Sequence, residues 1–120
     1  MKHILIVEDD ADLRFVIRMV LERAGYEVAE AGHGFAALGA IENRLPDLVI
    51  ADMTMPLMNG TELIDRIRSN RSTVSIPIVL LSGRDVDSAD SQLVSAVVSK
   101  PFEPADLLAS IDRILAERPV

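Results

Sequence analysis

The sequence predicts an α/β fold in which a doubly wound, five-stranded parallel sheet is covered by helices on both faces. Short runs rich in Ile, Val and Leu alternate with longer segments whose apolar residues recur every three or four positions. This alternation favours right-handed strand–helix–strand crossovers and hence a parallel sheet. The first and third runs are apolar almost throughout, as strands buried on both faces are. We therefore expect one three-layer domain over residues 1–120, with strand order 2-1-3-4-5.

Five apolar runs are predicted as strands, at residues 3–7, 26–29, 47–51, 76–81 and 96–98. Four segments have helical spacing, at residues 13–24, 35–43, 61–69 and 104–117. Gly25 stands where the first helix would end, and that helix is expected to bury Val16 and Met19. A fourth helix in chain order, near residues 88–94, is expected to be short or displaced. Its segment "SADSQ" is polar, and short helices are marginal in water.

Composition and charge exclude several classes of function. The net charge of −7 argues against a nucleic-acid-binding surface. The chain has no cysteine, so neither disulfides nor thiol chemistry are expected. No apolar run approaches the roughly 20 residues that a membrane-spanning helix needs. The first residues do not resemble a signal peptide, so we expect a cytoplasmic protein without a membrane partner.

Acidic residues follow two of the predicted strands. The first strand is followed by Glu8, Asp9 and Asp10, and the third by Asp52. These strands are neighbours in the expected order, so Glu8, Asp9 and Asp52 should meet at one edge of the sheet. Their charges would repel unless a cation neutralised them, and oxygen ligands suit Mg²⁺, with Mn²⁺ possible. Asp9 or Asp10 could instead cap the first helix, and Asp10 is the expected cap.

Two further polar residues end the fourth and fifth strands, Ser82 and Lys100. Each alone would also be typical of a turn serine or an exposed loop lysine. Lys100 precedes Pro101, and such a peptide bond can be cis. A carboxylate, a hydroxyl, an ammonium group and a divalent cation at one site could together support phosphoryl transfer. Asp52, alone on the central strand, is the best placed nucleophile.

The segments "ILIVEDD", "PDLVIADMTMPLMNG", "LLSG" and "KPF" occur in this order along the chain. Together they resemble the receiver domain of bacterial two-component response regulators, including the stand-alone chemotaxis regulators, over essentially the whole sequence. The resemblance implies a flavodoxin-like fold, a Mg²⁺ site and phosphorylation by a histidine kinase or a histidine phosphotransfer protein. We expect either a stand-alone regulator or a receiver domain taken from a longer protein.

The resemblance also implies roles for particular residues. Four would hold the metal: Asp9 directly, Glu8 mainly through water, Asp52, and Thr54 through its main-chain carbonyl. Asp52 would accept the phosphoryl group, Ser82 would form a hydrogen bond with it, and Lys100 would contact one of its oxygens. The protein would then be a signalling module that catalyses only its own phosphorylation and dephosphorylation, and that changes its binding face for an unknown output protein.

The sequence departs from the family pattern in two places. Val97 stands three residues before Lys100, where the family usually carries Tyr or Phe, and the stretch from Ser82 to Lys100 is short by about one helical turn. We therefore expect switching through the loop after Ser82 rather than through an aromatic side chain. A phosphatase that turns over external substrates is disfavoured because Thr54 replaces its second aspartate. The remaining alternative is a phosphorylation-independent interaction module with a receiver fold.

Overall fold

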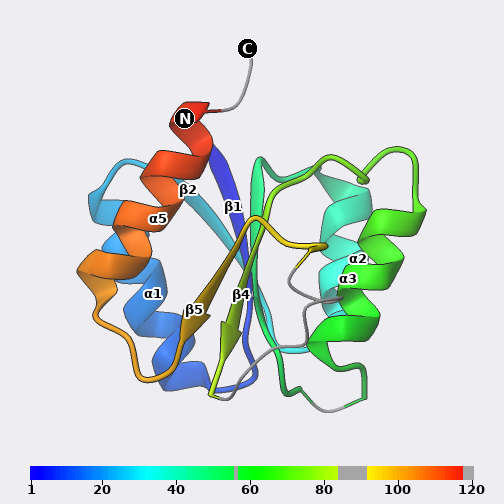
Figure 1. Ribbon diagram of the computed structural model, residues 1–120, viewed down its shortest axis with the longest axis horizontal. Helices are drawn as coiled ribbons and strands as arrows, with labels where there is room; N and C mark the ends of the chain where they lie inside the picture. Colours follow the sequence, from blue (N-terminus) through cyan, green and yellow to red (C-terminus); the bar gives the residue numbers. More distant parts are fainter. Residues whose placement is uncertain (56, 84–91, 118–120) are drawn as a thin grey trace.

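The apolar runs form one parallel sheet with strand order β2-β1-β3-β4-β5 (Figure 1). The structure is a computed structural model that describes residues 1–55, 57–83 and 92–117. The strands are β1 (His3–Val7), β2 (Glu27–Ala31), β3 (Leu48–Asp52), β4 (Ile78–Ser82) and β5 (Ala96–Ser99). The predicted fold class and strand order are both confirmed.

Helices cover both faces of the sheet. They are α1 (Ala11–Arg23), α2 (Gly34–Asn43), α3 (Gly60–Ser69) and α5 (Pro104–Glu117). In Figure 1, α1 and α5 lie on one side of the sheet, and α2 and α3 lie on the other. The short helix predicted near residues 88–94 lies mostly outside the described residues, and its described part, residues 92–94, forms turns and a bend.

The buried side chains form two layers separated by the sheet. Along β1, Ile4 and Ile6 pack in the layer beneath α1 and α5, whereas Leu5 and Val7 pack in the layer beneath α2 and α3. Burial of each such side chain contributes about 1.5–3 kcal/mol. Because both layers draw on every central strand, the carboxyl ends of β1, β3 and β4 are held at one edge as a rigid frame.

The ends of α1 follow the sequence signals. The side chain of Asp10 accepts hydrogen bonds from the backbone N–H groups of Asp12 (3.0 Å) and Leu13 (3.2 Å), which confirms it as the helix cap. Gly25 follows the helix with a φ of 97°, a conformation that glycine adopts without strain. The acidic turn before α1 is therefore fixed on its helical side.

Three details of the prediction were wrong. The second strand runs on to Ala31, because Glu30 and Ala31 pair with β1 and the carboxylate of Glu30 is held by Arg14 and Arg18 of α1. Val16 is 42% exposed and Met19 is only half-buried. The stripe of α1 that is fully buried is centred on Ile17 and Leu21 and is narrower than the apolar pattern suggested.

None of the helices in the described part of the chain is long and apolar enough to cross a membrane.

Candidate functional site

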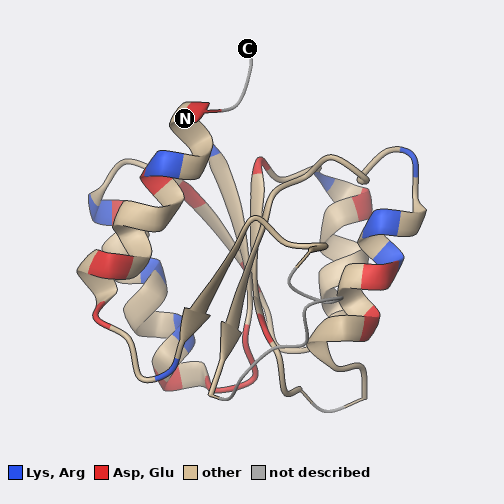
Figure 2. Ribbon diagram, in the orientation of Figure 1, with Lys and Arg blue, Asp and Glu red and all other residues tan. Residues whose placement is uncertain are grey.

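Three carboxylates meet at the edge of the sheet toward which the strands point. Glu8 directly follows β1 and is fully buried, Asp52 is the last residue of β3 and is 5% exposed, and Asp9 is exposed. Oxygens of the three side chains lie within 4.8 Å of one another. Figure 2 shows acidic segments gathered at this end of the sheet. The cluster forms because β1 and β3 are paired neighbours, as the sequence predicted.

Lys100 reaches this cluster from the far end of the chain. Its Nζ lies 2.9 Å from Glu8 Oε1 and 2.8 Å from Asp52 Oδ1. The residue directly follows β5, its backbone N–H donates to the carbonyl of Ser82 (2.7 Å), and its bond to Pro101 is cis. The side chain therefore bridges two acidic residues, which the reading as an exposed loop lysine does not explain.

Burial and charge oppose each other in this cluster. Burial has the largest effect on the pKa of Glu8, and the negative charge of Asp52 acts in the same direction, while the hydrogen bond from Lys100 opposes both; the net result is a pKa raised to about 7. Burial lowers the pKa of Lys100, but its bonds to Asp52 and Glu8 outweigh that effect and leave the pKa raised. Lys100 is therefore held as a cation between the two carboxyl groups.

The donor set fits a hard divalent cation. Among the described residues, the buried Oε2 of Glu8 has no hydrogen-bond partner. Buried polar atoms are seldom left without one, so this oxygen is available to a ligand or to water. Carboxylate oxygens are the donors that Mg²⁺ takes from proteins, usually together with several waters. The exposed Asp9 leaves the cluster open on one side.

Ser82 and Thr54 both lie near the carboxyl end of β3. Ser82 ends β4, next to the end of β3, and is 1% exposed. Thr54 is exposed in the loop that leads from Asp52 toward α3. The Met53 N–H at the start of that loop donates to the carbonyl of Leu81 (2.8 Å). The metal role of Thr54 and the phosphoryl-binding role of Ser82 stay predictions.

Gly60 begins α3 against the backbone at the end of β3. A Cβ at this position would lie 2.6 Å from the carbonyl oxygen of Asp52 and 2.9 Å from Cα of Met53. The Gly60 N–H also donates to the carbonyl of Met53 (2.9 Å). The helix can pack this closely only because residue 60 carries no side chain.

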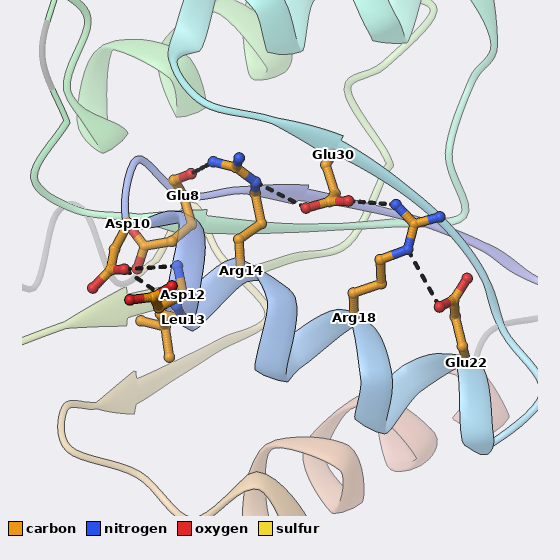
Figure 3. Close-up of polar contacts among 8 residues, drawn as sticks. All are labelled: Glu8, Asp10, Asp12, Leu13, Arg14, Arg18, Glu22 and Glu30. Carbon is orange, nitrogen blue, oxygen red and sulfur yellow. Dashed lines mark hydrogen bonds and ion pairs between the residues drawn. The ribbon is translucent and has the colours of Figure 1, made fainter.

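Sequence reasoning missed one residue at the site, Arg14. Its Nη1 donates to the main-chain carbonyl of Glu8 (2.6 Å), and its Nε donates to Glu30 (2.9 Å), as Figure 3 shows. No pattern of residue types could have identified the first bond, because every residue has a main-chain carbonyl.

The geometry agrees with the comparison with known protein families. The family model for the response regulator receiver domain matches residues 4–112. The chain belongs to this family. Receiver domains are phospho-acceptor signalling domains of two-component systems. They are not enzymes that act on external substrates.

Individual relatives give the same family. The phosphate regulon transcriptional regulatory protein PhoB of Pseudomonas aeruginosa is 36% identical over 118 residues, which are 95% of this chain and 52% of PhoB. The receiver domain described here thus spans about half the length of that relative. The chemotaxis response regulator CheY4 of Vibrio cholerae superposes with a TM-score of 0.89 at 29% identity, covering 95% of this receiver domain and 98% of that chain.

A third relative bears on the metal. The receiver domain of the sensor histidine kinase PA1611 from Pseudomonas aeruginosa PAO1 superposes with a TM-score of 0.87 at 25% identity, covering 97% of this receiver domain and 98% of that chain. That structure holds a magnesium ion coordinated in the active-site cleft.

Proposed function

We propose that this receiver domain accepts a phosphoryl group on Asp52 from a phosphohistidine donor, in a Mg²⁺-dependent reaction. The observation that carries the proposal is the bridge from Lys100 Nζ to Asp52 Oδ1 (2.8 Å) and Glu8 Oε1 (2.9 Å), within a cluster of three carboxylates. An ammonium group and a cation-binding cluster beside a buried carboxylate suit the charge of a phosphoryl group. The donor would be a histidine kinase or a histidine phosphotransfer protein.

The proposed transfer exchanges a P–N bond of the donor for a P–O bond to Asp52. A carboxylate oxygen of Asp52 forms a bond to phosphorus while the P–N bond to the donor's imidazole breaks, and the leaving nitrogen takes the electron pair of that bond, so that imidazole protonated on its other nitrogen leaves as the neutral ring. Lys100 would turn from Asp52 to an oxygen of the bound phosphoryl group, and Ser82 would form a hydrogen bond with another. Hydrolysis of the acyl phosphate by water would restore Asp52.

The metal would be held by Glu8, Asp9, Asp52 and the main-chain carbonyl of Thr54. When bound, Mg²⁺ supplies positive charge that offsets the oxygens of the transferring group. The donor set also allows Mn²⁺. Among the described residues, Lys100 brings a positive charge to this cluster through its contacts with Glu8 and Asp52.

The output would be a change in the face that binds a partner protein. Val97 is 38% exposed on β5 and replaces the aromatic residue of the family pattern, so no aromatic side chain at this position can couple to Ser82. We therefore propose that the response involves the loop after Ser82, residues 84–91 of which lie outside the described part of the chain. Unchanged amide exchange in that loop on binding a phosphate analogue would contradict this.

The acceptor assignment is tested by intact mass after incubation with acetyl phosphate, with and without Mg²⁺. We expect one phosphoryl adduct that requires both Mg²⁺ and Asp52 and that is absent from Asp52→Asn. Asp65→Asn, which removes an exposed carboxylate of α3, is the matched control and should still form the adduct. An adduct that persists in Asp52→Asn would overturn the assignment.

A second donor separates the remaining alternatives. Phosphoramidate carries the P–N bond of phosphohistidine on a small molecule. An adduct with phosphoramidate but not with acetyl phosphate would indicate an acceptor selective for P–N donors. If neither donor reacts although Mg²⁺ binds, the domain would be better described as a phosphorylation-independent interaction module.

A further inference from the structure

We infer that Arg14 is a positioning residue for the cation site. It ties the turn that contains Glu8 and Asp9 to the edge strand β2. The inference rests on the proposed function and extends it to a residue that touches neither the metal nor the phosphoryl group. Arg14 lies in the first half of α1, and its guanidinium group connects the acidic turn with β2 (Figure 3).

Arg14 forms two bonds with different partners. Its Nη1 donates to the main-chain carbonyl of Glu8 at 2.6 Å, and its Nε donates to Oε1 of Glu30 at 2.9 Å. The guanidinium group also lies beside Gly32, whose Cβ position would be 3.6 Å from Nη1. A planar guanidinium has donors in a fixed geometry, so holding both partners sets the distance between the turn and β2.

The bond to Glu8 completes the anchoring of its backbone. The Glu8 N–H donates to the carbonyl of Ala31 on β2 (3.1 Å), and its carbonyl accepts from Arg14, which is itself tied to β2 through Glu30. On the other side of the turn, Asp10 caps α1. Asp9 therefore projects from a turn that is fixed at both ends.

A fixed turn matters for a magnesium site in particular. Mg²⁺ requires near-ideal octahedral geometry, so small displacements of a ligand reduce its affinity. The carboxylates also repel one another, and a loose turn would let Asp9 move away from Glu8 and Asp52 in the metal-free state. Arg14 opposes that movement through the main-chain carbonyl of Glu8 and does not itself occupy a carboxylate oxygen of the cluster.

The same helix offers a matched control. Arg18 lies one turn further along α1 and also pairs with Glu30, through Nη1, and with Glu22, whose Oε1 is 3.3 Å from Arg18 Nε (Figure 3). No described bond joins Arg18 to the acidic turn. Arg14→Gln and Arg18→Gln therefore remove the same charge and an ion pair with the same Glu30, but only the first removes the bond to Glu8.

The experiment measures Mg²⁺ affinity by calorimetry, thermal unfolding, and amide exchange of Asp9 and Asp10 in the Mg²⁺-free protein. For Arg14→Gln we expect Mg²⁺ affinity to fall by about 10-fold, the range seen when partners behind metal ligands are removed, with faster amide exchange in the turn. Arg18→Gln should change the affinity by less than about twofold, because an exposed ion pair contributes little. Arg14→Lys, which keeps the charge but cannot hold both partners, should lie between wild type and Arg14→Gln.

Two results would overturn the inference. One is an Arg14→Gln protein with wild-type affinity and wild-type exchange at Asp9 and Asp10. The other is an equal loss of affinity in Arg14→Gln and Arg18→Gln, which would indicate a general effect of charge. If Arg14→Gln fails to fold, the same comparison is made with Arg14→Lys. A wild-type domain that binds no Mg²⁺ would contradict both this inference and the metal dependence in the proposed function, whereas wild-type binding with unaffected variants would contradict this inference alone.

Discussion

Tyr26 illustrates how one side chain can report on the folded state. It is the only tyrosine of a chain without tryptophan, and its hydroxyl donates to Asp112 of α5. Burial, together with the hydrogen bond to Asp112 and the charge of its carboxylate, raises the pKa of Tyr26 to about 12. We expect the ultraviolet absorbance of the native protein to show phenolate formation near pH 12, against about pH 10 for the unfolded chain.

The sign of the effect on stability follows from that shift. A raised folded-state pKa means that the contribution of Tyr26 to stability is present below pH 10 and is lost as the pH rises through 12. Asp112→Asn should lower the titration midpoint, while Asp106→Asn, an equal charge change on the same helix, should not. A wild-type midpoint near pH 10, with native circular dichroism at that pH, would contradict this account.

At the scale of elements, the packing of α3 against β3 depends on Gly60. Gly60→Ala would bring Cβ to 2.6 Å from the Asp52 carbonyl oxygen, and backbone atoms there cannot move aside cheaply. We expect a loss of about 1–3 kcal/mol in the free energy of unfolding, the usual cost of overpacking, measured by urea denaturation. Phosphoryl acceptance should fall as well, because the clash displaces the backbone of Asp52, the proposed acceptor.

Gly39→Ala is the control for that prediction. Gly39 lies inside α2, is exposed, and has no atom within 4 Å of a Cβ position. Alanine favours a helix interior over glycine by roughly 0.5–1 kcal/mol, so this variant should be more stable than wild type. Equal effects of the two substitutions would indicate that helix propensity, and not the close contact, decides the outcome.

Elements were predictable from the sequence to the extent that side-chain type determines them. The almost continuous apolar run of β1 predicted a strand buried on both faces, and Asp10 was identified as the cap because a short acidic side chain before an apolar periodic segment is typical of that position. Val16 was misassigned because apolar spacing alone does not give the width of the buried stripe. Tertiary packing sets that width.

The candidate site was predictable for a different reason. Strand order determines which strand ends are neighbours, so the predicted order already brought the acidic residues at the ends of β1 and β3 together. Arg14 could not be predicted in the same way, because its acceptor at the site is a main-chain carbonyl. Contacts between a side chain and the main chain depend on the exact course of a turn, which residue types do not encode.

For the whole molecule, the acidic cluster should lower stability in the absence of a cation. Asp9 is exposed and adds a third carboxylate beside Glu8 and Asp52, while Lys100 supplies one positive charge. We expect Asp9→Asn to raise the melting temperature without Mg²⁺, because it removes repulsion. With Mg²⁺ the order should reverse, since the wild type gains roughly 2.7 kcal/mol at about 100 times its Kd and the variant gains less.

Asp12→Asn serves as the control for this reversal. Asp12 is an exposed acidic residue in the first turn of α1, where a negative charge favours the helix, and it is not a member of the cluster. Its substitution should not raise the melting temperature without Mg²⁺. A wild type whose melting temperature is independent of Mg²⁺ would show that the cluster does not bind the cation at these concentrations.

The bridge between Lys100 and Glu8 joins residues 92 positions apart in the sequence. During synthesis, a chain that has not yet released its last strand from the ribosome would hold every carboxylate of the site but not the ammonium group that joins them. A partly synthesised domain should therefore react poorly with the proposed phosphohistidine donor. Comparing phosphoryl acceptance by ribosome-arrested chains that expose residues up to Ser95, before β5, with that of fully exposed chains would measure this. If only the latter react, completion of folding is itself the condition for entering the signalling pathway.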